Sequence, residues 1–284
     1  MLDFLAERFA AQPRAEWARR MRAGKVRDEV GQPVHEQQAY LGHTRLYYYR
    51  DCPTETATVI DAPVLYRDAH LLVVDKPHGV PVVPSGRYLH NALLVRLRHE
   101  TGIDTLTPIH RIDRDTAGLV MFSLQPATRD AYHALFRQRQ VHKTYEAVAP
   151  WRADLALPMT RRSRIGPGPH FLQQSELPGE PNAITTLEQV RNLGGLALYR
   201  LHPVTGQRHQ LRVHMASLGL PIVGDAIYPD LLPENAADPA QALQLLARSL
   251  RFTDPINGHL RQFTSQRSLA LAGDTDINAC APDG

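Results

Sequence analysis

The start of the chain carries apolar residues at helical spacing. Leu2, Leu5 and Phe9 recur every three or four positions, which predicts a short helix with one apolar face. Pro13 suits the first turn of a second helix, where the N–H that proline lacks would have no partner. Gly24 suits the C-terminal stop of that helix, since glycine adopts left-handed backbone conformations readily. The pattern therefore predicts two consecutive short helices.

A short hairpin is predicted after the second helix. Residues 25–34 hold two short arms around a turn at 31–33, where glycine and proline stand close together. The tyrosine-rich segment 47–50 is typical of a closing strand. Residues 51–62 are polar and contain proline, which suits a linker. We therefore expect residues 1–55 to form a small domain of their own.

Strand-like runs dominate the chain from Val64 onward. The clearest runs are 71–74, 118–122, 184–190 and 196–201. The last two flank the glycine-containing segment 192–195, which predicts a β-hairpin, and a helix is expected over 127–139. We therefore predict an α+β fold for residues 56–271, with a mixed, largely antiparallel sheet and flanking helices. The small, polar residues 272–284 are expected to form a disordered tail.

The composition fits an ordinary soluble globular protein. Of the 284 residues, 43% are hydrophobic and 21% are charged, which is enough for a substantial core. Cys52 and Cys280 form neither a CxxC pair nor a Cys/His cluster with zinc spacing, so we expect no metal and no disulfide framework. Acidic residues near the N-terminus argue against a signal peptide, and no apolar run is long enough to span a bilayer. We therefore expect a cytoplasmic protein with no membrane partner.

Positive charge is concentrated in the second predicted helix, although the whole chain has a net charge of only +3. The basic residues in and just beyond this helix are Arg14, Arg19, Arg20, Arg22, Lys25 and Arg27. Within the helix only Glu16 opposes them. Such a run is either a solvated helix face or a binding surface for nucleic acid, and charge alone leaves both interpretations open.

Three later segments hold residues that could carry chemistry. They are residues 110–118 (HRIDRDTAG), 143–145 (KTY) and 202–214 (HPVTGQRHQLRVH). Taken singly, their residues have ordinary structural explanations. Asp113 and Asp115 suit a turn before a strand, because aspartate side chains accept hydrogen bonds from nearby backbone. Tyr145 suits a half-buried position on a strand.

The end of the third segment alternates polar and apolar residues, which predicts a strand over 209–214. In a strand, Gln210, Arg212 and His214 would share one face and His209 would lie on the other. A buried arginine at this place would need a carboxylate partner. Two histidines on opposite faces would be poor ligands for a single metal ion.

Together these segments resemble the RluA-type pseudouridine synthase family. Residues 75–79 (DKPHG) are similar to the family's first motif, and residues 110–118 to its HRLDxxTSG signature. Residues 143–145 are similar to its KxY motif, and residues 205–225 to its TGRxHQLRVH…LGxPIxGD pattern. The resemblance covers nearly all of residues 60–265, and four motifs in order make it specific. It implies the pseudouridine synthase fold with a central catalytic cleft.

The resemblance also implies a cofactor-independent enzyme that isomerises uridine in structured RNA to pseudouridine after extruding the base. Asp113 would act on the cation-like C1′ or, alternatively, remove the C2′ proton. Arg212 would pair with this carboxylate, and Tyr145 would stack on the uracil and help remove the C5 proton. Arg111 would fill the space that the base leaves. Further residues of these motifs expected to contact RNA are His110, Arg208 and His209. The N-terminal unit resembles αL-type RNA-binding domains, so Arg19 and Arg20 are expected to contact RNA as well.

Parts of the sequence are also compatible with other functions. A non-catalytic RNA-binding or ribosome-assembly protein of the same fold is the main alternative, but the intact catalytic set argues against it. A metal-dependent hydrolase using His110, His209 and His214 lacks suitable spacing. A kinase is excluded because Ile112 interrupts the His-Arg-Asp tripeptide and no DFG follows. We expect a monomer that acts on ribosomal RNA of the large subunit in preference to transfer RNA.

Overall fold

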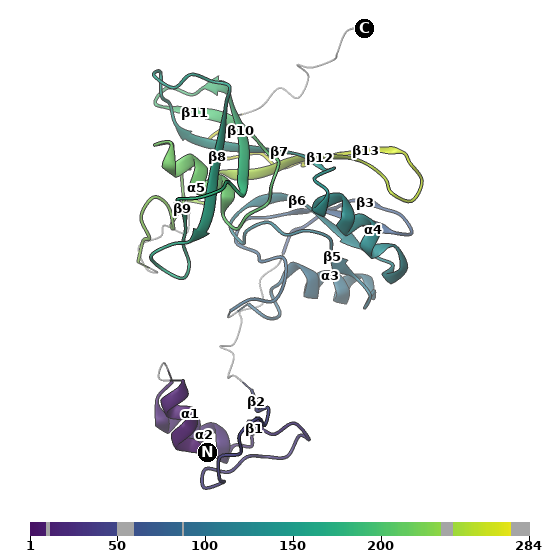
Figure 1. Ribbon diagram of the computed structural model, residues 1–284. Coiled ribbons are helices and arrows are strands. Elements are labelled where there is room, and N and C mark those ends of the chain that lie inside the picture. Colours follow the sequence, from purple (N-terminus) through teal and green to yellow (C-terminus); the bar gives the residue numbers. More distant parts are fainter. Residues whose placement is uncertain (10–11, 50–59, 87, 234–240, 274–284) are drawn as a thin grey trace. The chain divides into compact units, whose positions relative to one another are not determined.

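The computed structural model describes residues 1–9, 12–49, 60–86, 88–233 and 241–273 (Figure 1). The chain divides into two compact units, Met1–Glu55 and Thr56–Gly284. Each unit has hydrophobic clusters of its own. Most of the predicted linker, and both cysteines, lie outside the described residues. Among the described residues, no helix has the length and apolar character that crossing a membrane requires.

The N-terminal unit has the two predicted helices, α1 (Leu2–Arg8) and α2 (Arg14–Arg22). Strand β1 (Val26–Arg27) pairs antiparallel with β2 (Tyr47–Tyr48), which confirms the closing strand. The buried residues of this unit are Leu2, Leu5, Trp17, Ala18, Met21, Val26 and Val34. The unit is therefore built around one small apolar core that the helices and the strand pair share.

The basic run of α2 is more neutralised than the sequence suggested. Arg14 pairs with Asp3, and Arg22 pairs with Glu36, so Glu16 is not the only acidic partner. Glu16 itself accepts hydrogen bonds from both Arg19 and Arg20, and these bonds lower its pKa to about 2. Glu16 is the one acidic residue within the helix, as the sequence indicated, but acidic residues from outside the helix also pair with its arginines.

Arg20 is buried rather than presented to solvent. Its guanidinium carbon lies 5.7 Å from the centre of the Trp17 ring and 5.8 Å from that of Tyr48. Only 7% of the residue is exposed. Arg20 thus packs within the N-terminal unit and is poorly placed for the RNA contact expected of it, whereas Arg19 is exposed.

The second unit, Thr56–Gly284, holds the three segments expected to carry chemistry and is called the catalytic unit below. It is built on one sheet of 11 strands, ordered β3-β4-β6-β12-β7-β11-β10-β8-β9, with β13 beside β12 and β5 beside β6. The strands are β3 (Val64–Arg67), β4 (Leu71–Lys76), β5 (Thr107–Pro108), β6 (Ala117–Ser123), β7 (His142–Pro150), β8 (Met159–Pro167), β9 (Gln174–Leu177), β10 (Ala183–Asn192), β11 (Leu196–Pro203), β12 (Leu245–Thr253) and β13 (Leu260–Thr264). All named pairings are antiparallel except β6 with β12. The predicted α+β class and its mixed, largely antiparallel sheet are confirmed.

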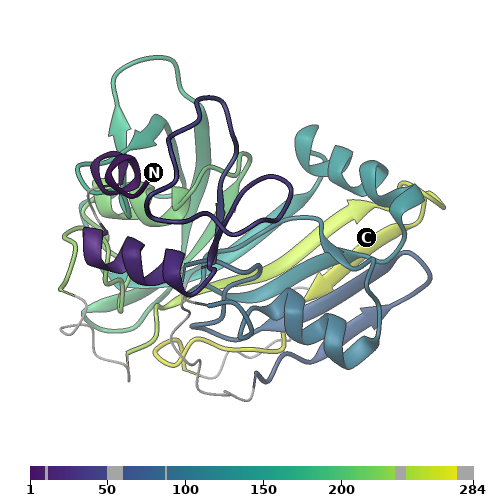
Figure 2. The same cartoon turned by 90° about the horizontal axis from the view of Figure 1, so that it is seen from below.

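Helices cover both faces of one half of the sheet. Helix α3 (Leu93–Thr101) packs on the even-numbered residues of β4 and β6, and α4 (Pro126–Arg137) packs on the odd-numbered ones. Figure 2 shows sheet strands lying between these two helices. Burial on both faces explains why β4 and β6 read as continuous apolar runs instead of alternating. The other half of the sheet packs against α5 (Gln210–Ser217).

Strand β12 joins the two halves, and Gly118 permits the junction. Gly118 on β6 lies opposite Ala247 on β12 in the parallel pairing. Its φ is +108°, and a Cβ at this position would overlap the carbonyl oxygen of Ala247. A side chain would therefore be strained and would separate the strands. The turn residues before this glycine are consequently brought to the middle of the sheet.

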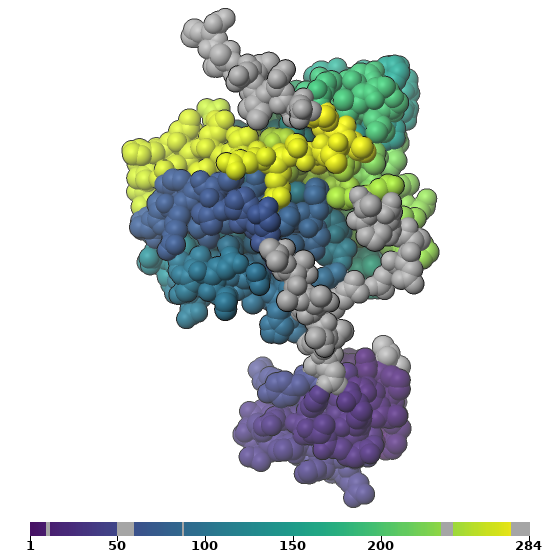
Figure 3. Space-filling model, turned by 180° about the vertical axis from the view of Figure 1, so that it is seen from behind, coloured from purple at the N-terminus to yellow at the C-terminus, as the bar shows by residue number. Residues whose placement is uncertain are grey.

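The C-terminal strands return to the start of the catalytic unit. The side chain of the buried Asp75 accepts hydrogen bonds from the hydroxyl of Ser265 and the N–H of Gln266. Figure 3 shows the yellow C-terminal segment lying beside the blue segment that contains β3 and β4. Ala272 is buried as well, so the predicted tail begins too early. Residues 274–284 lie outside the described range.

One predicted strand is a helix. Residues 210–217 form α5, and His209 precedes it with a left-handed φ of +55°. Six successive residues of α5, Gln210 to Met215, are buried. A helix buried on nearly all sides has no polar face, so its 3.6-residue period is not visible in the sequence. The strand predicted over 209–214 is therefore wrong.

Candidate active site

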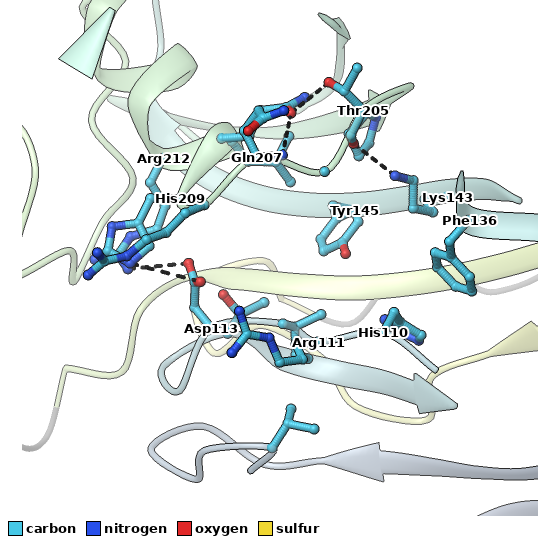
Figure 4. Close-up of a pocket in the computed structure, with 18 of the residues that line it drawn as sticks. His110, Arg111, Asp113, Phe136, Lys143, Tyr145, Thr205, Gln207, His209 and Arg212 are labelled. Atoms are coloured by element: carbon cyan, nitrogen blue, oxygen red, sulfur yellow. Dashed lines mark hydrogen bonds and ion pairs between the residues drawn. The ribbon is translucent and has the colours of Figure 1, made fainter. Parts of the chain in front are cut away.

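A cleft of about 720 Å³ lies in the catalytic unit where the two halves of the sheet meet (Figure 4). Its walls come from residues 81–85, from the loop 109–116 before β6, from the start of β7 and from the loop 203–209 that leads into α5. These include parts of all three segments that the sequence marked for chemistry. The motifs lie far apart in the chain and converge on one cavity.

Asp113 lies on the loop before β6, and its side chain is partly exposed to the cleft. Its carbonyl oxygen accepts a hydrogen bond from the N–H of Thr116, which closes a turn. Lys76 is fully buried and donates to the carbonyl oxygens of Pro77 and Arg114. Burial lowers the pKa of Lys76 to about 7, although the charges of Asp115 and Asp113 oppose the shift. The buried amino group of Lys76 thus anchors the backbone that presents Asp113.

Arg212 is the buried cation beside Asp113. Its Nη1 lies 3.4 Å from Asp113 Oδ2. Its Nε and Nη2 donate to the two oxygens of Asp225 at 2.8 and 2.6 Å. Burial opposes the charge on Arg212, but the hydrogen bonds and charge of Asp225, with that of Asp113, outweigh it and raise the pKa of the guanidinium. The predicted carboxylate partner exists, but the closer one is Asp225.

His209 lies at the other oxygen of Asp113. Its Nε2 is 3.9 Å from Asp113 Oδ1, and its Nδ1 is 2.9 Å from the hydroxyl of Tyr228. Burial lowers the pKa of His209, and the negative charge of Asp113 opposes this shift. Figure 4 shows His209 and Arg212 converging on the same carboxylate. Asp113 therefore faces a nitrogen at each oxygen.

Tyr145 projects into the cleft from β7, opposite the Asp113 loop (Figure 4). Burial raises the pKa of Tyr145, and the negative charge of Asp113 raises it further. The phenol is therefore neutral at physiological pH. Lys143, two residues earlier, donates to the carbonyl oxygen of Thr205 at 2.8 Å, and burial lowers its pKa to about 8. A neutral ring and a cation thus line this wall.

The expected RNA contacts of the catalytic unit fall into two groups. Arg111, Arg208 and His209 line the cleft, and the two arginines are exposed. His110 also lines the cleft, but its ring stacks on Phe136 with centroids 4.7 Å apart. Its Nε2 accepts a hydrogen bond from the N–H of Met121, and burial lowers its pKa to about 3. His110 is therefore a neutral packing residue in this geometry.

The three histidines of the hydrolase alternative do not converge. His214 is fully buried on α5, with its ring nitrogens 2.9 Å from Thr185 Oγ1 and 3.0 Å from Ser163 Oγ. It does not line the cleft that contains His110 and His209. In the described part of the chain, histidine, cysteine and carboxylate side chains form no cluster of three that could hold a metal ion.

Sequence reasoning missed three residues that shape this site. Lys76 and Asp225 lie in recognised motifs but had no role assigned to them. The requirement of a buried Arg212 for a carboxylate could have pointed to Asp225, which follows 13 residues later. Tyr228 gave no signal, because an isolated tyrosine is by default a packing residue.

The chain is similar to known RNA pseudouridine synthases. A family model described as RNA pseudouridylate synthase matches residues 70–217. An uncharacterized RNA pseudouridine synthase from Synechocystis sp. is 30% identical over 242 residues, which cover 83% of this chain and 81% of that protein. The dual-specificity RNA pseudouridine synthase RluA of Yersinia pestis is 36% identical over 199 residues, which cover 68% of this chain and 92% of that protein. The solved structure of human RNA pseudouridylate synthase domain containing 1 aligns with 75% of this chain and 86% of the human chain, at 24% sequence identity and a TM-score of 0.61. This similarity supports the fold.

Proposed function

This chain belongs to the RluA-type RNA pseudouridylate synthase family, and we propose that Asp113 is the residue that carries its chemistry. The protein is an RNA pseudouridine synthase, an isomerase with RNA as its partner. The observation that supports Asp113 is its position: a carboxylate on an anchored loop, open to the cleft, with Arg212 and His209 at its two oxygens. A preorganised anion of this kind suits a sugar carbon that becomes positively charged.

The reaction moves the link between sugar and base from N1 to C5 of uracil. The C1′–N1 bond breaks, and C1′ becomes cation-like. Asp113 stabilises or captures this centre, as carboxylates do in glycosidases, or removes the C2′ proton. The detached uracil carries the electron pair of the broken bond on N1; it then turns, and C1′ bonds to C5. The C5 proton is lost and N1 takes up a proton, so the product is an isomer of the substrate. Every step uses groups of the substrate and the chain, so no cofactor is required.

Tyr145 orients the uracil in this proposal. Its ring lies in the cleft opposite Asp113, where a flipped base can stack on it (Figure 4). Because its pKa is raised, Tyr145 is a neutral hydroxyl group and a weak base. It therefore assists the departure of the C5 proton by positioning the base and by hydrogen bonding.

Arg111 and Arg208 are the proposed RNA contacts at the mouth of the cleft. Arg111 is exposed beside Asp113, where its planar guanidinium can stack in the space that the flipped base leaves. Arg208 donates to the carbonyl oxygens of Phe171 and Leu172 and remains exposed. Both guanidinium groups can pair with phosphates.

We favour ribosomal RNA of the large subunit as the substrate, with transfer RNA as the second candidate. A separate N-terminal unit with an exposed Arg19 could extend the contact with a large folded RNA beyond the target loop. A relative from Saccharomyces cerevisiae is described as a mitochondrial tRNA pseudouridine(32) synthase, so transfer RNA belongs in the test beside ribosomal RNA. Mapping pseudouridine in total RNA from cells with and without this protein identifies the site directly.

The catalytic assignment is tested by Asp113→Asn, which keeps the shape of the side chain and removes its charge. Tritium release from RNA carrying 5-tritiated uridine should fall to background, while the melting temperature stays close to that of the parent. Asp115→Asn, on the same loop, is the matched control and should retain most of the activity. A folded Asp113→Asn enzyme that still turns over would refute the assignment and favour a different catalytic group.

A further inference from the structure

Tyr228 contacts both Arg212 and His209, the two residues beside the carboxylate of Asp113. This tyrosine is 6% exposed and follows Asp225 by three residues. Its own N–H donates to Asp225 Oδ1, so the turn that holds Arg212 also fixes Tyr228. The guanidinium of Arg212 lies 5.3 Å from the centre of the Tyr228 ring. The ring of Tyr228 therefore contacts Arg212, which lies at Asp113 Oδ2. Its hydroxyl contacts His209, which lies at Asp113 Oδ1.

The hydroxyl of Tyr228 is placed to favour one tautomer of His209. It accepts a hydrogen bond from the backbone N–H of Gln174 at 2.7 Å, so its own proton is left to donate. His209 Nδ1, at 2.9 Å, is in position to accept it. In a neutral imidazole, an accepting Nδ1 requires the proton to be on Nε2. This is the nitrogen that lies 3.9 Å from Asp113 Oδ1.

The backbone supports the same interpretation. His209 adopts a left-handed φ of +55° at the N-terminal end of α5. This conformation is uncommon for residues other than glycine and is usually maintained by surrounding contacts. The side chain is only 9% exposed, and its ring meets that of Tyr228 at 88° with centroids 5.7 Å apart. The ring is thus held edge-on by a buried neighbour and is not free to rotate toward other partners.

We propose that Tyr228 and His209 form a positioning pair for the catalytic aspartate. Tyr228 donates to Nδ1 of His209, and His209 directs its Nε2 proton toward Asp113 Oδ1. Arg212 serves the other oxygen. N–H groups of His209 and Arg212 then face the two oxygens of the carboxylate at 3.9 and 3.4 Å, and their attraction favours this orientation when C1′ of the substrate approaches. This inference deepens the proposed function and rests on Asp113 being the catalytic residue.

The tautomer is tested directly by nitrogen-15 NMR of the imidazole groups at neutral pH. The pattern of couplings from the ring protons distinguishes a protonated Nε2 from a protonated Nδ1, and the His209→Gln spectrum assigns the signal. The proposal expects His209 to be neutral with its proton on Nε2. A dominant Nδ1–H form in the parent enzyme overturns it. Tyr228→Phe should shift the population toward the other tautomer.

Two substitutions of His209 separate positioning from folding. Gln places an amide N–H near the location of the histidine Nε2, whereas Asn reaches only to the location of Nδ1. Asn, however, tolerates the left-handed backbone better than Gln. His209→Gln should therefore keep more single-turnover activity, although His209→Asn should be at least as stable. If activity follows stability instead, the role of His209 is structural and the proposal fails.

The pairing is tested by a double-mutant cycle in the full-length enzyme. Tyr228→Phe should lower the single-turnover rate at saturating RNA by roughly tenfold, the upper end of the range for a neutral hydrogen bond, without changing RNA affinity. His209→Leu should lower it at least as much. Because Tyr228 acts through His209, adding Tyr228→Phe to His209→Leu should cause little further loss. Independent losses that multiply, or a Tyr228→Phe enzyme with the parent rate, would overturn the pair.

The two proposals fail in distinguishable ways. If Asp113→Asn remains active, the proposed catalytic residue is wrong, and the positioning pair has no catalytic carboxylate to orient. If Asp113→Asn is inactive while the variants of Tyr228 and His209 turn over normally, only the pair is wrong. Thermal unfolding and RNA binding of each variant establish that a lost rate belongs to a folded, substrate-binding enzyme.

Discussion

Asp225 and Asp113 both contact Arg212, and one amide substitution at each should separate stability from catalysis. Asp225 is fully buried and makes the two shorter contacts, at 2.8 and 2.6 Å. Asp113 is 28% exposed and lies 3.4 Å away. Asp225→Asn would leave a buried guanidinium without its close counterion. We expect the free energy of unfolding to fall by about 3–5 kcal/mol, the usual loss when one member of a buried ion pair is removed.

Asp113→Asn should behave differently. Water already reaches this carboxylate, and Arg212 keeps its bidentate partner when Asp113 is neutral. We expect a loss of about 1 kcal/mol or less, as for exposed pairs, together with the loss of activity. Asp130→Asn is the matched control, because Asp130 pairs with Arg137 at a largely exposed site and should change stability by a similarly small amount.

Urea unfolding followed by tryptophan fluorescence measures these differences. Trp151 lies in the catalytic unit and Trp17 in the N-terminal unit, so a Trp17→Phe background assigns the signal to the catalytic unit. For a domain of this size, a loss of 3–5 kcal/mol corresponds to a fall in melting temperature of roughly 10 °C. Equal losses for Asp225→Asn and Asp113→Asn would show that the two carboxylates share Arg212 equally. A stable Asp225→Asn protein would refute the buried ion pair itself.

Three further perturbations follow from the structure. Gly118→Ala should lower the free energy of unfolding by about 3 kcal/mol, since the new Cβ overlaps the Ala247 carbonyl and φ is +108°. Gly194→Ala is the control in urea unfolding, because φ is +84° there but the space around a new Cβ is open. Burial lowers the pKa of His214 to about 4, so the unfolded chain takes up its proton first, near its ordinary 6.5. Stability should therefore be full above pH 6.5 and fall by up to about 3 kcal/mol as the pH drops to 4, a slope that His214→Gln reduces. Removing residues 1–55 should raise KM and flatten the salt dependence of RNA binding by roughly 0.7 per lost phosphate contact on a log–log scale, with little change in kcat; an unchanged slope would favour a purely structural unit.

Strands were the part of the fold that the sequence predicted best, for two different reasons. Strands β4 and β6 are covered on both faces, so their uninterrupted apolar runs mark them clearly. Strands β10 and β11 are joined by a glycine-containing turn, and the pairing of Leu187 with Leu201 fits the predicted hairpin. Both signals are local, because an apolar run or a glycine-containing turn can be recognised from a few consecutive residues.

Helix α5 was misassigned because its polar residues have specific partners instead of solvent. Gln210 accepts from the hydroxyl of Thr205 and donates to that of Thr185, and His214 also contacts Thr185. Arg212 is satisfied by Asp225. When polar groups are paired inside the protein, polarity no longer marks the exposed face, and an alternating pattern can occur in a helix. The partners come from strand β10 and from loops on either side of the helix, and the sequence of the helix alone does not identify them.

The meeting of Asp113, Tyr145 and Arg212 follows from the order of strands across the sheet. Gly118 on β6 is level with Ala247 on β12, and Ala247 is level with Tyr145 on β7. The loop of Asp113 therefore ends one strand away from the ring of Tyr145. Tyr145 is in turn level with Leu201 on β11, whose chain continues through the loop 203–209 into α5 and Arg212. Each motif identifies a residue type, but only the insertion of β12 between β6 and β7 brings these residues to one cleft, and that insertion depends on a pairing more than a hundred residues apart in sequence.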